Sequence, residues 1–103
     1  MKKFIQNIKG THANIVIHGA INKRNAQAHR QRLAKLAKRG IQTVRINMAN
    51  VHFIDSTGLI FLVKGKKLFG DKKKNFILHN LSSHVSFFLK ETEFFKLFEI
   101  ERK

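Results

Sequence analysis

The stretch VHFIDSTGLIFLV, residues 51–63, decides the fold of this chain. A β-branched and aromatic run ends in Asp55-Ser56-Thr57-Gly58, and a second apolar run follows directly. Asp, Ser and Thr are the residue types that cap helix N-termini, where free backbone N–H groups and the helix dipole favour negative charge. The stretch therefore predicts an apolar segment that leads into a helix from Thr57 to about Phe69. It also places Ser56 where a phosphate group would be well accommodated.

Strands and helices are predicted to alternate along the rest of the chain. The predicted strands are 3–9 and 14–18 around a Gly10-Thr11 turn, 41–48, and 76–79. The other predicted helices are 24–39 and a last one that Ser82 or Ser83 caps and that runs to about Glu91. Residues 94–100 follow as a hydrophobic segment that can form an edge strand. This alternation predicts a single α/β domain over 1–103, with a mixed sheet of four to five strands and three to four helices.

Apolar spacing predicts which helix faces pack inward. In 24–39, the apolar residues Ala26, Leu33, Leu36 and Ala37 lie on one stripe, and Asn22 or Asn25 is expected to cap its start. In the helix that begins at Thr57, the residues expected to face the core are Leu59, Leu62 and Val63. The adjacent pairs Phe87/Phe88 and Phe94/Phe95 cannot all point inward, so some of them are expected in an exposed patch.

Composition restricts the function further. The chain has 103 residues, no cysteine and a formal net charge of +15, with no Asp or Glu before Asp55. This charge favours an anionic partner, either nucleic acid, an acidic membrane surface contacted by the basic helix 24–39, or an acidic protein, unless it is background composition. No apolar run approaches the roughly 20 residues of a membrane span, and the N-terminus turns polar too early for a signal peptide, so we expect a cytoplasmic protein.

The stretch around Asp55 resembles the signature of the STAS domain of anti-sigma factor antagonists, a bacterial regulatory family. In that family an apolar strand leads into Asp-Ser-(Ser/Thr)-Gly-Leu and a helix, as Asp55 to Leu59 do here. The resemblance covers essentially the whole chain. Residues 15–22 look like the family's strand ending in Gly-Glu-Leu-Asp, although Ala20 and Asn22 replace its two acids.

The resemblance implies a non-enzymatic regulator of transcription that works by partner switching. A serine kinase of the histidine-kinase ATPase fold, which also acts as the anti-sigma factor, would phosphorylate Ser56, and a phosphatase would reverse this. The expected partner-binding residues are Asp55, Ser56, Thr57, Gly58, Asn22 and Arg24. Gly58 is expected to let the partner approach the backbone closely. No metal and no cofactor are expected.

Other functions compete with this one. STAS domains also serve as subunits of ABC-type lipid transporters, where the partner is the ATPase subunit. Charge alone suggests a nucleic-acid-binding protein, but the chain has no zinc finger or aromatic-basic RNA motif. An aspartic protease is improbable, because one Asp-Ser-Thr-Gly loop supplies one carboxylate where two are needed. The six histidines lack the spacing of a metal site and are expected at the surface or at strand ends.

Overall fold

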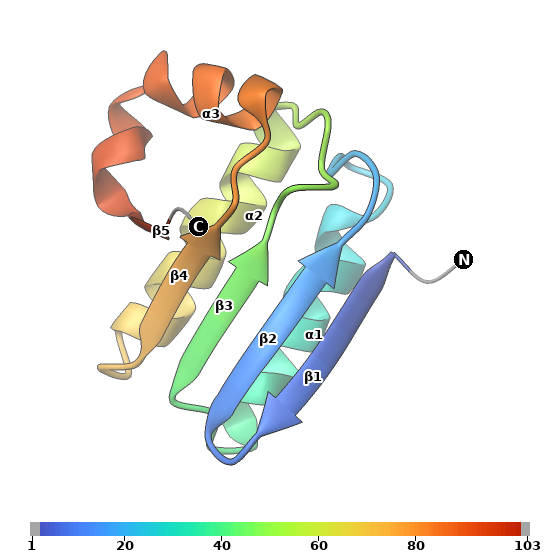
Figure 1. Ribbon diagram of the computed structural model, residues 1–103. Helices are drawn as coiled ribbons and strands as arrows, with labels where there is room; N and C mark the ends of the chain where they lie inside the picture. Colours follow the sequence, from blue (N-terminus) through green and yellow to red (C-terminus); the bar gives the residue numbers. More distant parts are fainter. Residues whose placement is uncertain (1–2, 102–103) are drawn as a thin grey trace.

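Five strands form a single mixed sheet in the computed structural model, which describes residues 3–101 (Figure 1). Their order across the sheet follows the sequence, and only β1 runs antiparallel to its neighbour β2. The strands are β1 Phe4–Lys9, β2 His12–Ile17, β3 Thr43–Asn47, β4 Asn75–His79 and β5 Glu99–Glu101. Helical crossovers join the parallel strands, as the alternating pattern predicted.

Two helices, α1 and α2, cover one face of the sheet, and α3 lies at the end where β3 and β4 finish (Figure 1). The helices are α1 Ala26–Lys38, α2 Ser56–Gly70 and α3 Ser83–Lys90, followed by the 3-10 helix η1 Glu93–Leu97. The predicted α/β class, strand number and helix number are confirmed. The start of α1 differs from the predicted residue 24, because Asn22 O accepts from Asn25 N at 3.1 Å and makes a turn first.

The core lies between the sheet and these two helices, and it contains a histidine. The predicted stripe of α1 is buried, but His29 completes it at 4% exposure, so the expected surface position is wrong for this residue. Its ring centroid lies 5.3 Å from that of Phe4 and 5.9 Å from that of Phe61. Desolvation, and then the nearby charges of Arg32 and Lys3, lower the pKa of His29.

Helix α2 packs closer to the sheet than its apolar pattern suggested. Leu62 is fully buried as expected, whereas Leu59 and Val63 are only partly buried. The deepest contacts come from Phe61, Phe69 and two glycines, because a helix without a Cβ at those points approaches its neighbours closely. An added Cβ at Gly65 would lie 2.8 Å from a ring carbon of Phe76.

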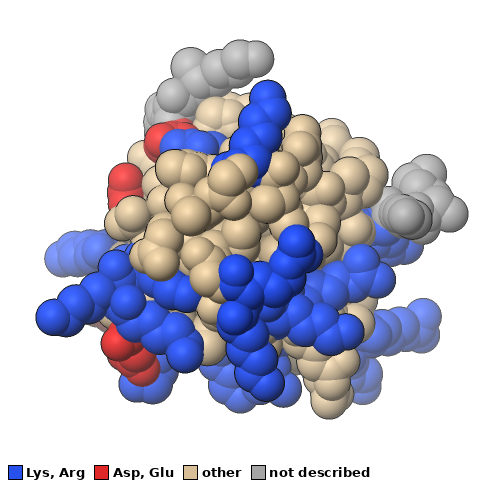
Figure 2. All heavy atoms as spheres, turned by 90° about the horizontal axis from the view of Figure 1, so that it is seen from below, with Lys and Arg blue, Asp and Glu red and all other residues tan. Residues whose placement is uncertain are grey.

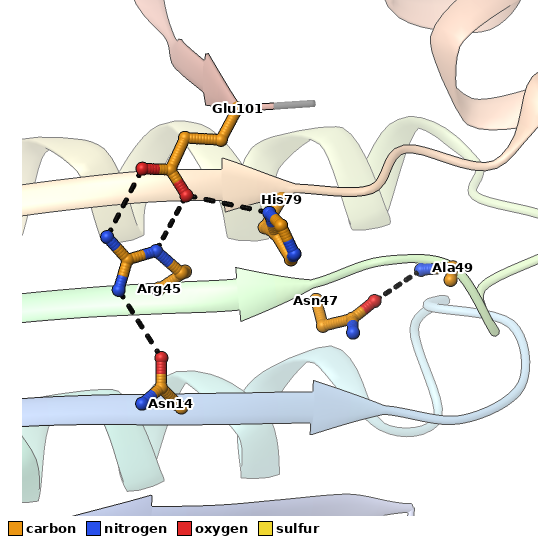
Figure 3. Close-up of polar contacts among 6 residues, drawn as sticks. All are labelled: Asn14, Arg45, Asn47, Ala49, His79 and Glu101. Atoms are coloured by element: carbon orange, nitrogen blue, oxygen red, sulfur yellow. Dashed lines mark hydrogen bonds and ion pairs between the residues drawn. The ribbon is translucent and has the colours of Figure 1, made fainter. Parts of the chain in front are cut away.

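The other face of the sheet is polar, and an ion pair on it anchors the short edge strand β5 (Figure 3). Arg45 on β3 donates to both carboxylate oxygens of Glu101, from Nε at 2.7 Å and from Nη2 at 3.2 Å. This bidentate hydrogen bond lowers the pKa of the Glu101 carboxyl. His79 Nδ1 lies 3.5 Å from the same carboxylate, so residues of three strands meet at Glu101.

The C-terminal part of the described chain has phenylalanines at its surface as well as against its core. Ser82 caps α3 by accepting from Val85 N at 3.3 Å, and its hydroxyl donates to Val51 O. Phe88 and Phe95 pack against the core, while Phe87 and Phe94 are exposed, Phe87 to 67%. The paired phenylalanines therefore divide between core and surface.

Candidate functional site

Two loops run side by side at the carboxyl ends of β2 and β3. Gly19 N donates to Asn50 O at 3.0 Å, and Ile21 N donates to Phe53 O at 3.1 Å. Ile21 and Ile54 also form an isolated parallel bridge. The loops thus continue the pairing of the two strands and bring residues 21–24 beside residues 53–58.

Asp55 caps α2. Its Oδ1 accepts a hydrogen bond from Gly58 N at 2.9 Å, and its carbonyl accepts the first helical bond from Leu59 N, also at 2.9 Å. A carboxylate in this position satisfies a free N–H group and complements the positive end of the helix dipole. The predicted capping by Asp55 is confirmed, and it fixes where Ser56 begins the helix.

Ser56 is the first residue of α2 and is exposed, and its hydroxyl bonds to no atom of residues 3–101. Thr57 is half-buried and lines a groove of about 210 Å³ between α1 and α2. Three cationic side chains, Lys23, Arg30 and Lys64, line the same groove. Of the two neighbouring hydroxyls, the Ser56 hydroxyl is therefore the one presented to solvent, at the positive end of a helix and beside a basic groove.

Gly58 makes its close approach inside the molecule. It is buried, and an added Cβ would lie 2.5 Å from the backbone oxygen of Ile21 and 3.0 Å from Cβ of Ile54. The expectation that a partner would approach this backbone is corrected, because the neighbouring loop already occupies that space. Gly58 instead allows α2 to start directly against the 21–24 loop.

Asn22 and Asn25 hold the neighbouring loop rather than cap α1. Asn25 stands at the cap position, but its Oδ1 accepts from Asn22 N at 3.0 Å and its Nδ2 donates to Ala20 O at 2.8 Å. Asn22 Oδ1 accepts from Arg24 N at 2.9 Å. The predicted cap is therefore wrong, since both side chains bond to loop atoms. These bonds order the loop that carries Arg24, whose side chain is exposed.

Two apolar side chains at the site were not anticipated from the sequence. Phe53 and Ile60 are exposed to 48% and 50% and flank Ser56 in the chain. The Phe53 ring lies 5.3 Å from the ring of His84 on α3. From the sequence alone, a hydrophobic residue just before a helix cap is expected in the core. In the structure Val51 is buried, whereas Phe53, two residues later, is exposed.

Within residues 3–101, no three side chains of His, Cys, Asp or Glu are grouped so as to hold a metal ion. Among the helices of that range, none has the length and apolar character needed to cross a bilayer.

A model of the STAS domain family matches residues 4–103. The chain belongs to the STAS domain family. The family predicted from the Asp55 signature is thus confirmed, and the match includes the Ser56 site and the closing strand β5. No curated protein matches the sequence.

Solved structures share the fold of this STAS domain at low sequence identity. A putative anti-sigma factor antagonist from Thermotoga maritima is 19% identical, with a TM-score of 0.88 over 97% of this chain and 86% of its own. SpoIIAA, an anti-sigma factor antagonist, in its unphosphorylated form is 17% identical, with a TM-score of 0.80 over 97% and 87%. The phosphorylated form of SpoIIAA from Bacillus is 15% identical, with a TM-score of 0.77 over 97% and 90%. At these identities the likeness establishes the fold.

Proposed function

We propose that this STAS domain is a non-enzymatic regulatory domain of the anti-sigma factor antagonist type, and that phosphorylation of Ser56 controls its partner binding. The observation that carries this proposal is the position of Ser56. It is exposed at the start of α2, and Asp55 already fills the capping role. The serine hydroxyl is thus left without a structural task and within reach of a kinase.

A phosphate on Ser56 would be tolerated by the domain itself. Phosphorylation adds a charge of about −1.5 to −2 and three acceptor oxygens, and the N-terminus of the 15-residue helix α2 favours such a group. Lys23, Arg30 and Lys64 lie in the adjacent groove. Ala20 and Asn22, which stand in place of the family's acids, remove two sources of repulsion.

Phosphorylation of Ser56 would instead weaken the binding of the partner. Phe53 and Ile60 provide apolar contacts on either side of Ser56, and Arg24 on the ordered neighbouring loop adds a charged contact. A phosphate in such an interface has to be desolvated without a matching cation on the partner. If this weakens binding by about 3 kcal/mol, affinity falls more than a hundredfold.

The proposed partner is a serine kinase of the histidine-kinase ATPase fold that also restrains a sigma factor in the cytoplasm. The unphosphorylated domain binds it and frees the sigma factor; phosphorylation ends the binding, and a phosphatase restores it. Solved structures support a fold that persists in both states, since SpoIIAA is known in an unphosphorylated and a phosphorylated form, each similar to this chain.

Phosphorylation by a serine kinase of the proposed fold, taken from the same organism, tests the site. Incubation with that kinase and ATP should add one phosphate, which mass spectrometry should locate on Ser56. Ser56→Ala should abolish the modification and leave the circular dichroism spectrum unchanged. Thr57→Val is the matched control, because it removes the neighbouring hydroxyl at constant shape, and it should still be phosphorylated. A phosphate found only on Thr57, or none, would exclude the Ser56 mechanism.

Partner capture tests the type of regulator. The unmodified domain should retain the kinase on a column, and the Ser56→Asp variant should retain less of it. Retention of an ATPase of the ABC transporter class in place of the kinase would reject the proposed partner and support the transporter alternative.

A further inference from the structure

The end of the molecule opposite Ser56 carries a dense cluster of cations (Figure 2). The β1–β2 turn and the loops before β3 and β4 meet there, joined by bonds from Gln42 N to Thr11 O and from Asn75 N to Gln42 O, both 2.8 Å. The helices α1 and α2 end on the same side. We call this surface the basic end; its cations are Lys9, Lys35, Lys38, Arg39, Lys67 and the three lysines of residues 72–74.

Only some of these cations contact a carbonyl or a carboxylate of the domain itself. Lys74 Nζ donates to Ala37 O at 2.8 Å, at the C-terminus of α1, and Lys67 Nζ lies 3.5 Å from Asp71 Oδ2. One or two cations suffice to complement the negative end of a helix dipole. Within residues 3–101, Asp71 provides the only ion pair to a carboxylate at the basic end. Most of the cluster is therefore exposed and uncompensated.

The acids lie elsewhere in the fold. Asp55 caps α2 at the opposite end of the molecule, Glu91 follows α3, Glu93 begins η1, and Glu99 and Glu101 belong to β5. Five of the six acids of the chain are thus away from the basic end, where eight of its 21 Lys and Arg residues gather. The basic end thus carries eight cations against a single acid, Asp71.

We propose that the basic end binds the phosphate backbone of duplex nucleic acid without sequence preference. A duplex presents one negative charge per about 1.7 Å of its axis, so a surface on a domain of 33 × 32 × 26 Å meets several phosphates at once. Seven of the eight cations are lysines, which act as point charges on flexible stems. Such side chains can neutralise phosphates without the fixed geometry that contacts to base edges require.

The basic end has no large exposed apolar side chain among the described residues, and this favours duplex nucleic acid over single strands and membranes as its partner. The large exposed apolar residues of the described chain all lie outside it; they are Ile5, Phe53, Ile60, Phe87, Phe94 and Leu97. Single-stranded nucleic acid is held by stacking of its bases on aromatic side chains, and peripheral membrane binding is strengthened by apolar side chains inserted between lipids. The basic end offers charge alone, as a duplex backbone requires. The surface around Ser56 stays free while it is bound.

Fluorescence anisotropy with a labelled 20-base-pair duplex of random sequence tests this proposal. Saturable binding is expected at 50 mM salt and should weaken linearly on a log–log scale towards 200 mM. The variant Lys38→Gln/Arg39→Gln/Lys72→Gln should bind at least tenfold more weakly, and its salt slope should be smaller by about 2.7, since each phosphate contact contributes about 0.9. The matched control Lys23→Gln/Lys64→Gln/Lys96→Gln has the same net charge and should lose less than threefold.

Four results would overturn the proposal. They are no duplex binding by the unaltered protein, an equal loss in the two triple variants, tighter binding to a single-stranded oligonucleotide of the same length, and binding to vesicles containing phosphatidylserine but not to duplex. Circular dichroism of both variants should match that of the unaltered protein, so that a loss of affinity reports on the surface and not on folding.

Discussion

The two ends of the sheet in this STAS domain differ in character: one is closely packed and the other is strongly charged. At the Ser56 end, the loop of residues 18–22 and the loop of residues 50–55 are joined by backbone hydrogen bonds, and Gly58 packs directly against Ile21. At the basic end, backbone bonds also join the loops, but exposed cations cover much of the surface. The first end depends on the position of individual atoms and the second on the sum of charges. Substitutions should therefore have large, local effects at the first and small, additive, salt-dependent effects at the second.

The largest effect is expected from Gly58→Ala. The new Cβ would lie 2.5 Å from Ile21 O, a backbone atom held in place by the bridge to Ile54, so the loop or the helix has to shift. We expect the free energy of unfolding to fall by about 2–3 kcal/mol, the scale of overpacking in a well-packed site. Chemical denaturation measures it.

Gly70→Ala is the matched control, because Gly70 is the last residue of the same helix and an added Cβ there has no neighbour within 4 Å. Its stability should be unchanged or higher, since alanine favours helix more than glycine does. Equal effects of the two substitutions would mean that the Ser56 end is as tolerant as the basic end, and the comparison would fail.

A smaller effect is expected at His29, a buried side chain whose protonated, charged form is disfavoured by its surroundings. Burial lowers the pKa of His29 below its usual 6.5, so the unfolded chain binds its proton more readily than the folded one. The resulting contribution to the free energy of unfolding is fully present above pH 6.5. It is lost as the pH falls from 6.5 towards the lowered pKa. His29→Leu should remove this loss.

Neither ring nitrogen of His29 has a hydrogen-bond partner within the described residues, so His29→Leu should also raise stability at pH 7, by about 1 kcal/mol. Denaturation at pH 7 and at pH 5 measures both effects. His12→Leu, at an exposed position on β2, is the control and should keep the pH dependence of the parent protein. A parent protein with equal stability at both pH values would show that His29 is protonated in the core without penalty.

The smallest effect is expected for a single charge at the basic end. Lys35 and Arg39 are four residues apart at the end of α1, both exposed, and like charges at this spacing repel by about 0.2–0.5 kcal/mol. Lys35→Gln should therefore leave stability unchanged or raise it by a few tenths of a kcal/mol at low salt. The gain should vanish in 1 M salt, where charges are screened beyond about 3 Å. A destabilisation that persists at high salt would show that Lys35 has a packing role.

Local patterns in the sequence determined much of the fold. Alternation and helical period depend on neighbouring residues, so the strands, the helices and the buried stripe of α1 were predictable within a few residues. The cap of α2 was predictable for the same reason, because Asp55 bonds to an N–H group only three residues away. The sequence also placed Ser56 at the start of a helix, and hence in the position on which its proposed phosphorylation depends.

Tertiary structure decided what depends on residues far apart in the chain. Gly58 faces Ile21, His29 lies between Phe4 and Phe61, and the Asn25 side chain bonds back to Ala20 instead of capping α1. None of these partners is specified by periodicity, because each is set by how the helices settle on the sheet. The same holds for the basic end. The cations are spread along the sequence, and they gather on one surface only because parallel strands all begin at the same edge of the sheet and the two helices that cover it both end there.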